Sequence, residues 1–252
     1  MTPVSRPPFV RRTLLGALRR KLRLRRYIAE AKADRSPFVG DRILRQAVDF
    51  MLAECQVTHF VETGTYLGHT CRYIASTYTG LPITTIEQNE EFYAAAQVTL
   101  GRCPTVTRHL GDSADVLRRI LAANAIRGLP FFFLDAHWYD YLPLPSEIHT
   151  IGEYMSDAIM LIHDFQVPGR SAFGYDTCNG ATIGLAMLRD NLVLSKPYRV
   201  FLPLYSYQDA YPNIVPQPMP LRGHALVFQG ASLAVSKFCR SASAVYYDEV
   251  SL

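Results

Sequence analysis

The stretch "VETGTYLGHT", residues 61–70, joins an apolar run to a helical pattern and decides the fold. Gly64 has the conformational freedom that a tight turn with positive φ requires. Gly68 allows the following helix to pack close to the turn, and the N-terminus of that helix presents backbone N–H groups to a ligand. A strand, a glycine turn and a helix in this order predict a binding site at the carboxyl end of a parallel strand.

Short apolar runs alternate with helical patterns through the first two thirds of the chain. This alternation predicts βαβ units and therefore a parallel sheet. The expected strands cover residues 58–63, 81–87, 105–112, 129–138 and 157–165, and the expected helices cover 42–55, 68–78, 89–100, 114–123 and 144–155.

The C-terminal part has a different pattern. After a helix near 180–191, two apolar runs at 198–205 and 224–230 follow with no helical pattern between them, which predicts an antiparallel strand pair. We therefore expect an α/β, Rossmann-like fold with a mostly parallel seven-stranded sheet, helices on both faces and a C-terminal antiparallel strand pair. One domain over residues 41–252 accounts for this pattern, and residues 1–40 form a basic N-terminal segment.

Composition narrows the class of protein. With 49% hydrophobic and 19% charged residues the chain has ample material for a core. No run approaches the roughly 20 apolar residues that cross a bilayer. The five cysteines are scattered and form no CxxC pair, which argues against a disulfide framework or a structural zinc site. A reducing, cytoplasmic location is the expectation.

The N-terminal segment is strongly basic. Residues 1–26 carry nine of the 26 Arg and Lys residues and no acid, and leucines recur at helical spacing within 11–26. An amphipathic helix on an anionic membrane surface fits this pattern. A basic tail that is solvated, or that packs on the acidic remainder of the chain, fits it equally, and an organelle transit peptide has a similar composition. The sequence leaves these alternatives open, and it leaves the oligomeric state open as well.

The glycine turn also bears on the cofactor. A dinucleotide site needs G-x-G-x-x-G, but Tyr66 stands where the middle glycine would approach the pyrophosphate. S-adenosylmethionine has no pyrophosphate and accepts a side chain there. Further polar residues end the next strands: Glu87 can accept ribose hydroxyls, Asp112 and Ser113 can face an adenine edge, and Asp135 and His137 follow the fourth strand.

Across roughly residues 42–230 the chain resembles class I S-adenosylmethionine-dependent methyltransferases of the catechol O-methyltransferase type. The first motif resembles E-x-G-x-Y-x-G-x-[ST], which implies contacts with the cofactor from Glu62, Gly64, Thr65, Tyr66, Gly68 and Thr70. The resemblance also implies cofactor contacts from the residues that end the later strands, namely Glu87, Asp112, Ser113, Asp135 and Trp138.

The stretches "FLDAHW" and "IHDF" resemble the metal-binding parts of that family and of the metal-dependent sugar O-methyltransferases. The resemblance implies a divalent ion, magnesium or manganese, held by Asp135, His163 and Asp164. Histidine is a poor ligand for magnesium, which prefers oxygen donors. The chain also departs from the family because Ala136 is an extra residue and the catalytic lysine has no counterpart.

We expect methyl transfer from S-adenosylmethionine to a hydroxyl of a small molecule or sugar. A hydroxyl needs a base or a metal near neutral pH, and His137, together with Asp135, is the expected catalytic group. Nucleic acid is not an expected substrate, because the chain has no Asn/Asp-Pro-Pro-Tyr element after the fourth strand. The alternatives are a dinucleotide-dependent oxidoreductase and a non-catalytic nucleotide-binding module attached peripherally to a membrane.

Overall fold

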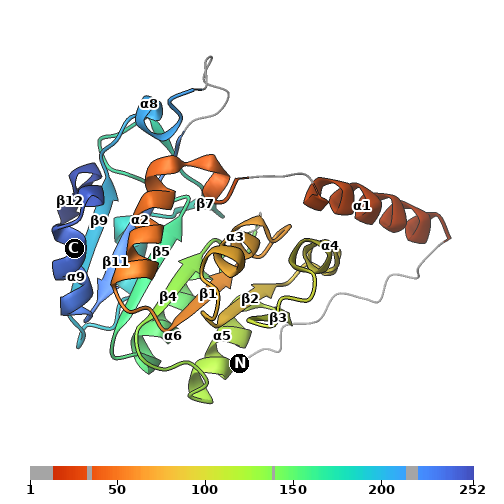
Figure 1. The fold of residues 1–252 in the computed structure, drawn as a ribbon, viewed down its shortest axis with the longest axis horizontal. Coiled ribbons are helices and arrows are strands. Elements are labelled where there is room, and N and C mark those ends of the chain that lie inside the picture. Colours follow the sequence, from red (N-terminus) through yellow and green to blue (C-terminus); the bar gives the residue numbers. More distant parts are fainter. Residues whose placement is uncertain (1–13, 33–35, 138–139, 214–220) are drawn as a thin grey trace.

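A computed structural model describes residues 14–32, 36–137, 140–213 and 221–252. Its main sheet has the strand order β12-β9-β11-β5-β4-β1-β2-β3 and fans across Figure 1 in that order. Neighbouring strands among β1 to β5 are parallel, as the alternating pattern predicted. These five are β1 (His59–Thr63), β2 (Ile83–Glu87), β3 (Val106–Leu110), β4 (Pro130–Leu134) and β5 (Ala158–His163).

The predicted Rossmann-like α/β fold is confirmed, but the strand count of seven was wrong because the main sheet has eight. Strands β9 (Tyr198–Pro203) and β11 (His224–Gln229) form the expected antiparallel pair. A third antiparallel strand, β12 (Tyr247–Val250), then pairs with β9. Its sequence "YDEV" is short and carries two exposed acids, so it lacks the apolar run that marks the other strands.

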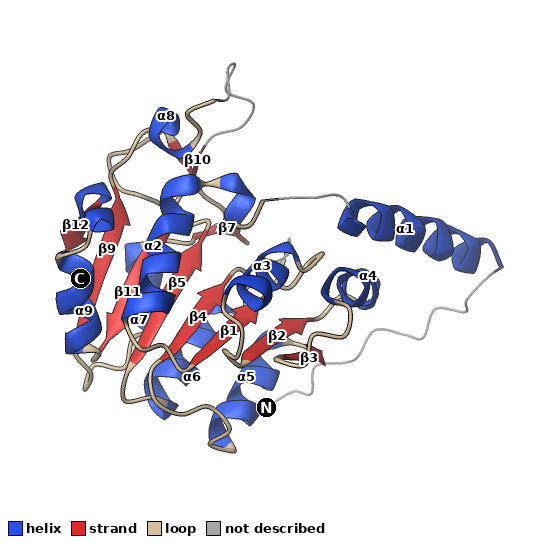
Figure 2. Ribbon diagram, viewed as in Figure 1, coloured by secondary structure: helices blue, strands red, loops and turns tan. Residues whose placement is uncertain are grey.

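Helices cover both faces of this sheet (Figure 2). They are α2 (Arg42–Glu54), α3 (His69–Thr77), α4 (Glu90–Leu100), α5 (Ser113–Ala122), α6 (Leu144–Tyr154), α7 (Leu185–Asn191), α8 (Tyr207–Ala210) and α9 (Ser232–Cys239), with 3₁₀ turns η1 (Phe38–Gly40) and η2 (Ala242–Tyr246). Because both faces are covered, β4 "PFFFL" and β5 "AIMLIH" are buried along their whole length. These two strands form the centre of the core.

The segment after β5 contains short strands that the sequence did not predict. Strand β6 (Phe173–Gly174) pairs with β10 (Leu221–Arg222), and β7 (Thr177–Cys178) pairs with β8 (Ala181–Thr182). The helix expected near 180–191 therefore begins only at Leu185. This small structure brings β10 over the carboxyl end of β5, where Phe165 N–H donates to the carbonyl of Gly223 at 2.9 Å.

The basic segment forms helix α1 (Leu14–Lys32), which packs against α4. Arg20 and Arg23 pair with Glu90 and Glu91 in the first turn of α4, so part of the basic segment lies on an acidic surface of the same chain. In the described part of the chain, no helix is both long and apolar enough to cross a membrane. Membrane contact through residues 11–26 stays a prediction.

Two glycines with positive φ provide a matched pair for testing the central turn. A Cβ on Gly64 (φ +85°) would lie 2.5 Å from the carbonyl oxygen of Asp135, whereas a Cβ on Gly80 (φ +95°) would meet nothing within 4 Å. Gly80→Ala should therefore cost only the backbone strain, about 1–2 kcal/mol. Gly64→Ala should cost about 1–3 kcal/mol more, because overpacking is added to the strain.

Urea unfolding of both variants measures the difference in the free energy of unfolding. Equal losses for the two alanine variants would contradict a tight contact between the turn and β4.

Candidate active site

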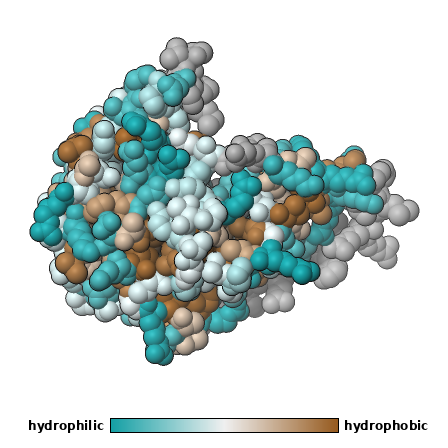
Figure 3. Space-filling view, in the orientation of Figure 1, coloured by the Kyte–Doolittle hydropathy of each residue, from teal (hydrophilic) through white to brown (hydrophobic). Residues whose placement is uncertain are grey.

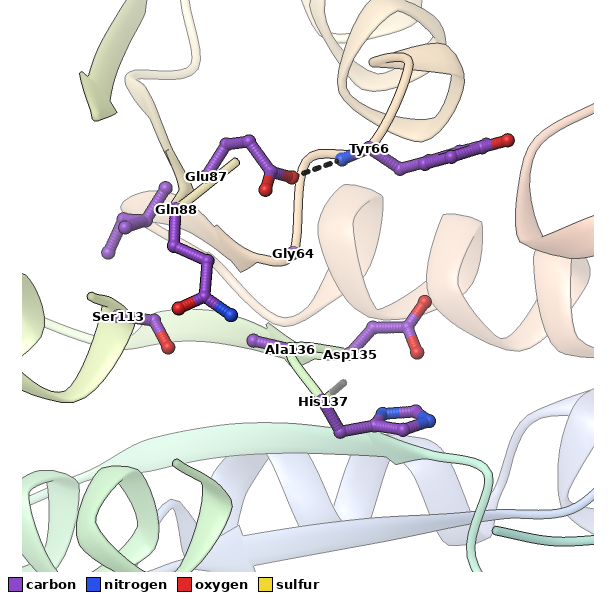
Figure 4. A pocket seen from close by; sticks show the side chains of 9 residues that line it. Gly64, Tyr66, Glu87, Gln88, Ser113, Asp135, Ala136 and His137 are labelled. Carbon is purple, nitrogen blue, oxygen red and sulfur yellow. Dashed lines mark hydrogen bonds between the residues drawn. The ribbon is translucent and has the colours of Figure 1, made fainter. Parts of the chain in front are cut away.

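A cavity of about 210 Å³ opens at the carboxyl ends of β1, β2 and β4. Figure 4 shows Glu87, Gln88 and Ser113 on one side of it and Asp135 and His137 on the other. Among the described residues, its lining consists of Gly64, Tyr66, Ile86, Glu87, Gln88, Ser113, Asp135, Ala136 and His137. The cavity therefore lies where ligands bind in open parallel sheets.

The glycine turn forms one wall of the cavity. Gly64 lies against the backbone of Asp135, and Gly68 (φ +78°) precedes α3 in the left-handed region. Tyr66 also has a positive φ of 49°, which is uncommon for a residue other than glycine. This conformation directs the N–H of Tyr66 toward Glu87. The ring turns away from the other cavity residues (Figure 4), and its centroid lies 4.8 Å from that of the Phe92 ring.

Glu87 ends β2 with its carboxyl group fixed by the backbone. Its Oε2 accepts the N–H of Tyr66 and its Oε1 accepts the N–H of Asn89, both at 2.8 Å. Burial raises the pKa of this carboxyl, although the backbone hydrogen bonds oppose the shift. Each carboxylate oxygen has a further lone pair, so the group can still accept hydroxyls from a ligand in the cavity.

Two other residues of the first motif lie behind the cavity wall. Glu62 is 2% exposed and accepts the hydroxyl of Thr85 at 2.6 Å. The Thr65 hydroxyl lies 2.5 Å from that same hydroxyl. Burial raises the pKa of Glu62 to about 8, so this carboxyl is mostly protonated at neutral pH. Neither side chain belongs to the cavity lining.

The remaining predicted cofactor residues have mixed positions. Ser113 lines the cavity, whereas Asp112 caps α5 by accepting the N–H of Asp115 at 3.1 Å. The hydroxyl of Thr70 accepts the N–H of Phe38 at 3.4 Å and is not part of the lining. The predicted adenine neighbour Trp138 lies outside the described residues.

A closed ring of charged side chains lies at the other end of the cavity. His137 Nε2 is 2.7 Å from Asp176 Oδ2 and 3.3 Å from Asp164 Oδ2. Arg222 joins the same two acids from the opposite side, donating to Asp164 Oδ1 through Nε and to Asp176 Oδ1 through Nη2. Asp164 has a positive φ of 55°, a strained conformation of the kind that collects at functional sites.

His163 extends this cluster into the core. Burial of His163 lowers its pKa, but the carboxyls of Asp135 and Asp164, each 3.3 Å from Nδ1, outweigh burial and raise the pKa to about 10. The hydrogen bonds of His137, first to Asp164 and then to Asp176, raise its pKa to about 9. Both imidazoles are therefore protonated at neutral pH.

The cluster brings the predicted metal ligands together. Potential ligand atoms of Asp135, His163 and Asp164 lie within 4.8 Å of one another. A metal, however, would have to displace the imidazole proton of His163 and compete with Arg222 for Asp164. Arg222, His137 and His163 lie among the three carboxyl groups, so a divalent cation would compete with these basic side chains for its ligands.

Three residues of this site were not predicted from the sequence. Gln88 directly follows Glu87, and this adjacency is the one feature of the sequence that could have pointed to it. Asp176 stands between β6 and β7, away from the strand ends that mark the other candidate residues. Arg222 lies 58 residues from Asp164 and 46 from Asp176, so no local pattern connects them.

Comparisons with known proteins agree with this architecture. No family model matches the sequence, and no curated protein matches it. Among solved structures, an O-methyltransferase from Bacillus cereus in complex with SAH superposes with a TM-score of 0.52 at 16% identity, covering 84% of this chain and 90% of that one. The N-terminal domain of EvdMO1, solved in the presence of SAH and D-fucose, gives a TM-score of 0.50 at 13% identity and covers 83% and 96%.

At this level of identity the likeness establishes the fold. The strand order, the glycine turn after β1 and the cavity at the carboxyl ends of the strands agree with it. The chain has the fold of the class I S-adenosylmethionine-dependent methyltransferases.

Proposed function

We propose that this protein transfers a methyl group from S-adenosylmethionine to a hydroxyl of a small molecule or sugar. The observation that carries the proposal is the two-ended cavity. Glu87 and Ser113 at one end are suited to a nucleoside, and the charged cluster with Asp135 and His137 at the other end is suited to an acceptor. The structural likeness to O-methyltransferases supports the same proposal.

The residues fit S-adenosylmethionine. Gly64 lines the cavity without a side chain, and the Glu87 carboxylate retains lone pairs for two ribose hydroxyls. Gln88 projects between Glu87 and Ser113 (Figure 4), where its amide can contact the adenosine part. Tyr66 disfavours a dinucleotide, because it occupies the position where the backbone would need to approach a pyrophosphate.

The reaction requires the chain to hold the acceptor hydroxyl beside the methyl group and to accept its proton. S-adenosylmethionine supplies a methyl group on a sulfonium; the acceptor oxygen forms a bond to the methyl carbon as the sulfur–carbon bond breaks. The hydroxyl proton must pass to a base, and His137 or Asp135 lies at the cavity wall to receive it. Arg222 and His163 hold Asp164 in place behind them and keep this end of the cavity ordered.

Two alternative functions differ from this proposal in the cofactor bound or in the product formed. A dinucleotide-dependent oxidoreductase would bind NAD, and a non-catalytic module would bind S-adenosylmethionine without producing S-adenosylhomocysteine. Calorimetry with both cofactors and an assay for S-adenosylhomocysteine separate the three functions.

Glu87→Ala should weaken S-adenosylmethionine binding by about 1.5–3 kcal/mol, because hydrogen bonds to a charged group are lost. Glu153→Ala is the matched control, since Glu153 is exposed and pairs with Arg118 at 3.1 Å on the helical surface. Isothermal titration calorimetry measures both. Wild-type affinity in a folded Glu87→Ala variant would remove this residue from the site.

The pH profile of kcat tests which group takes the proton. His137 accepts a proton only when neutral, and its pKa is raised to about 9. If His137 is the base, kcat should rise about tenfold per pH unit below that pKa and level off above it. His137→Gln should abolish this limb and lower kcat by roughly 10²–10⁴-fold. A profile that keeps its limb in the variant would contradict the assignment of His137 as the base.

Removal of metal tests the ion expected at Asp135, His163 and Asp164. We expect turnover to persist after dialysis against EDTA, because Arg222 and the two imidazoles already balance the carboxyl groups. If activity is lost and manganese or magnesium restores it, the reaction is metal-assisted. That result would refute a working state in which Arg222 and the two imidazoles alone balance the carboxyl groups.

A further inference from the structure

Helix α1 completes a small hydrophobic core that is separate from the main one. Its buried members are Ala31 on α1, Phe92 and Ala95 on α4, and Leu67, with Tyr27 and Ile28 packed at its border. Leu67 stands between Tyr66 and Gly68 in the glycine turn. One wall of this small core is therefore the back of the turn that lines the cavity.

A series of ring contacts runs from α1 to the cavity. The rings of Tyr27 and Phe92 meet edge to face at 4.8 Å, and those of Tyr66 and Phe92 do the same at 4.8 Å. Tyr66 is held in the left-handed region, and its N–H donates to Glu87 at 2.8 Å. Phe92 thus lies between Tyr27 on α1 and Tyr66, the residue whose N–H fixes Glu87.

Complementary charges set the register of the helix. Arg23 donates to both carboxylate oxygens of Glu91, at 3.0 and 2.7 Å, and Arg20 pairs with Glu90. The hydroxyl of Thr99 donates to the carbonyl of Ala31 at 3.3 Å near the other end of α1. Hydrophilic residues gather over α1 on the outer surface in Figure 3, so its apolar contacts are directed at α4 and the turn.

We propose that α1 is a part of the cofactor site: its docking on α4 holds the glycine turn in its binding conformation, and Tyr27 is a positioning residue. Left-handed Tyr66 needs support from its surroundings, and the small core provides that support from outside the cavity. Docking of α1 and binding of the cofactor are then coupled, so each favours the other. The identity of the ligand rests on the proposed function, whereas the coupling of α1 to the turn does not.

The test compares substitutions on the two faces of α1. Tyr27→Ala should weaken S-adenosylmethionine binding by roughly 5–10-fold in calorimetry, within the usual range of coupling between sites. Tyr27→Phe keeps the ring and should bind like the wild type. Leu22→Ala is the control, because Leu22 is 55% exposed on the same helix. In steady-state kinetics, the KM for the cofactor should rise in Tyr27→Ala while kcat at saturation changes little.

A charge exchange tests the docking itself. Arg23→Glu should weaken binding, and Arg23→Glu combined with Glu91→Arg should restore it, because the ion pair is re-formed with reversed polarity. A local loss of stability would not be rescued in this way.

Hydrogen exchange in the ligand-free protein separates this proposal from the proposed function. The amide of Tyr66 should exchange faster in Tyr27→Ala than in Leu22→Ala, whatever ligand the cavity takes. Unchanged exchange at Tyr66 would overturn the coupling, as would wild-type cofactor affinity in Tyr27→Ala. Faster exchange together with no binding of S-adenosylmethionine to the wild type would overturn the proposed function alone.

Discussion

The close approach of the first glycine turn to the end of β4 is the constraint on which the rest of the site depends. A Cβ at position 64 would lie 2.5 Å from the carbonyl oxygen of Asp135, so the two strand ends meet backbone to backbone. This contact sets the distance between Glu87, which Tyr66 holds through its N–H, and the charged cluster that begins at Asp135. The two ends of the cavity are positioned relative to each other by main chain rather than by flexible side chains.

Charge balance is the second requirement. Carboxyl groups close together in a partly buried place are costly unless basic groups pair with them. Here Asp164 is bounded by Arg222, His137 and His163, and these partners together lower its pKa strongly against the effect of burial. The cluster therefore holds its shape with the protein's own cations.

Local patterns predicted most of the fold, since the parallel strands are short runs between helical patterns and Gly64 marks the turn. They failed at β12, where tertiary pairing with β9 rather than hydrophobicity makes the strand.

In the site, residues next to a strand end such as Glu87 and Ser113 were predictable from position. Arg222 was not, because β10 reaches Asp164 only through pairing with β6. The sequence left open whether the basic N-terminal segment packs on the rest of the chain, and in the structure Tyr27 contacts Phe92 beside the turn.

Calorimetric titration of the purified full-length protein with S-adenosylmethionine, and in parallel with NAD, tests the central claim most directly. The cavity, with Tyr66 in place of the middle glycine of a dinucleotide turn and Glu87 fixed for a ribose, predicts saturable one-to-one binding of S-adenosylmethionine and no binding of NAD. Binding of NAD without binding of S-adenosylmethionine would contradict the assignment of the cavity, and with it the proposed methyl transfer.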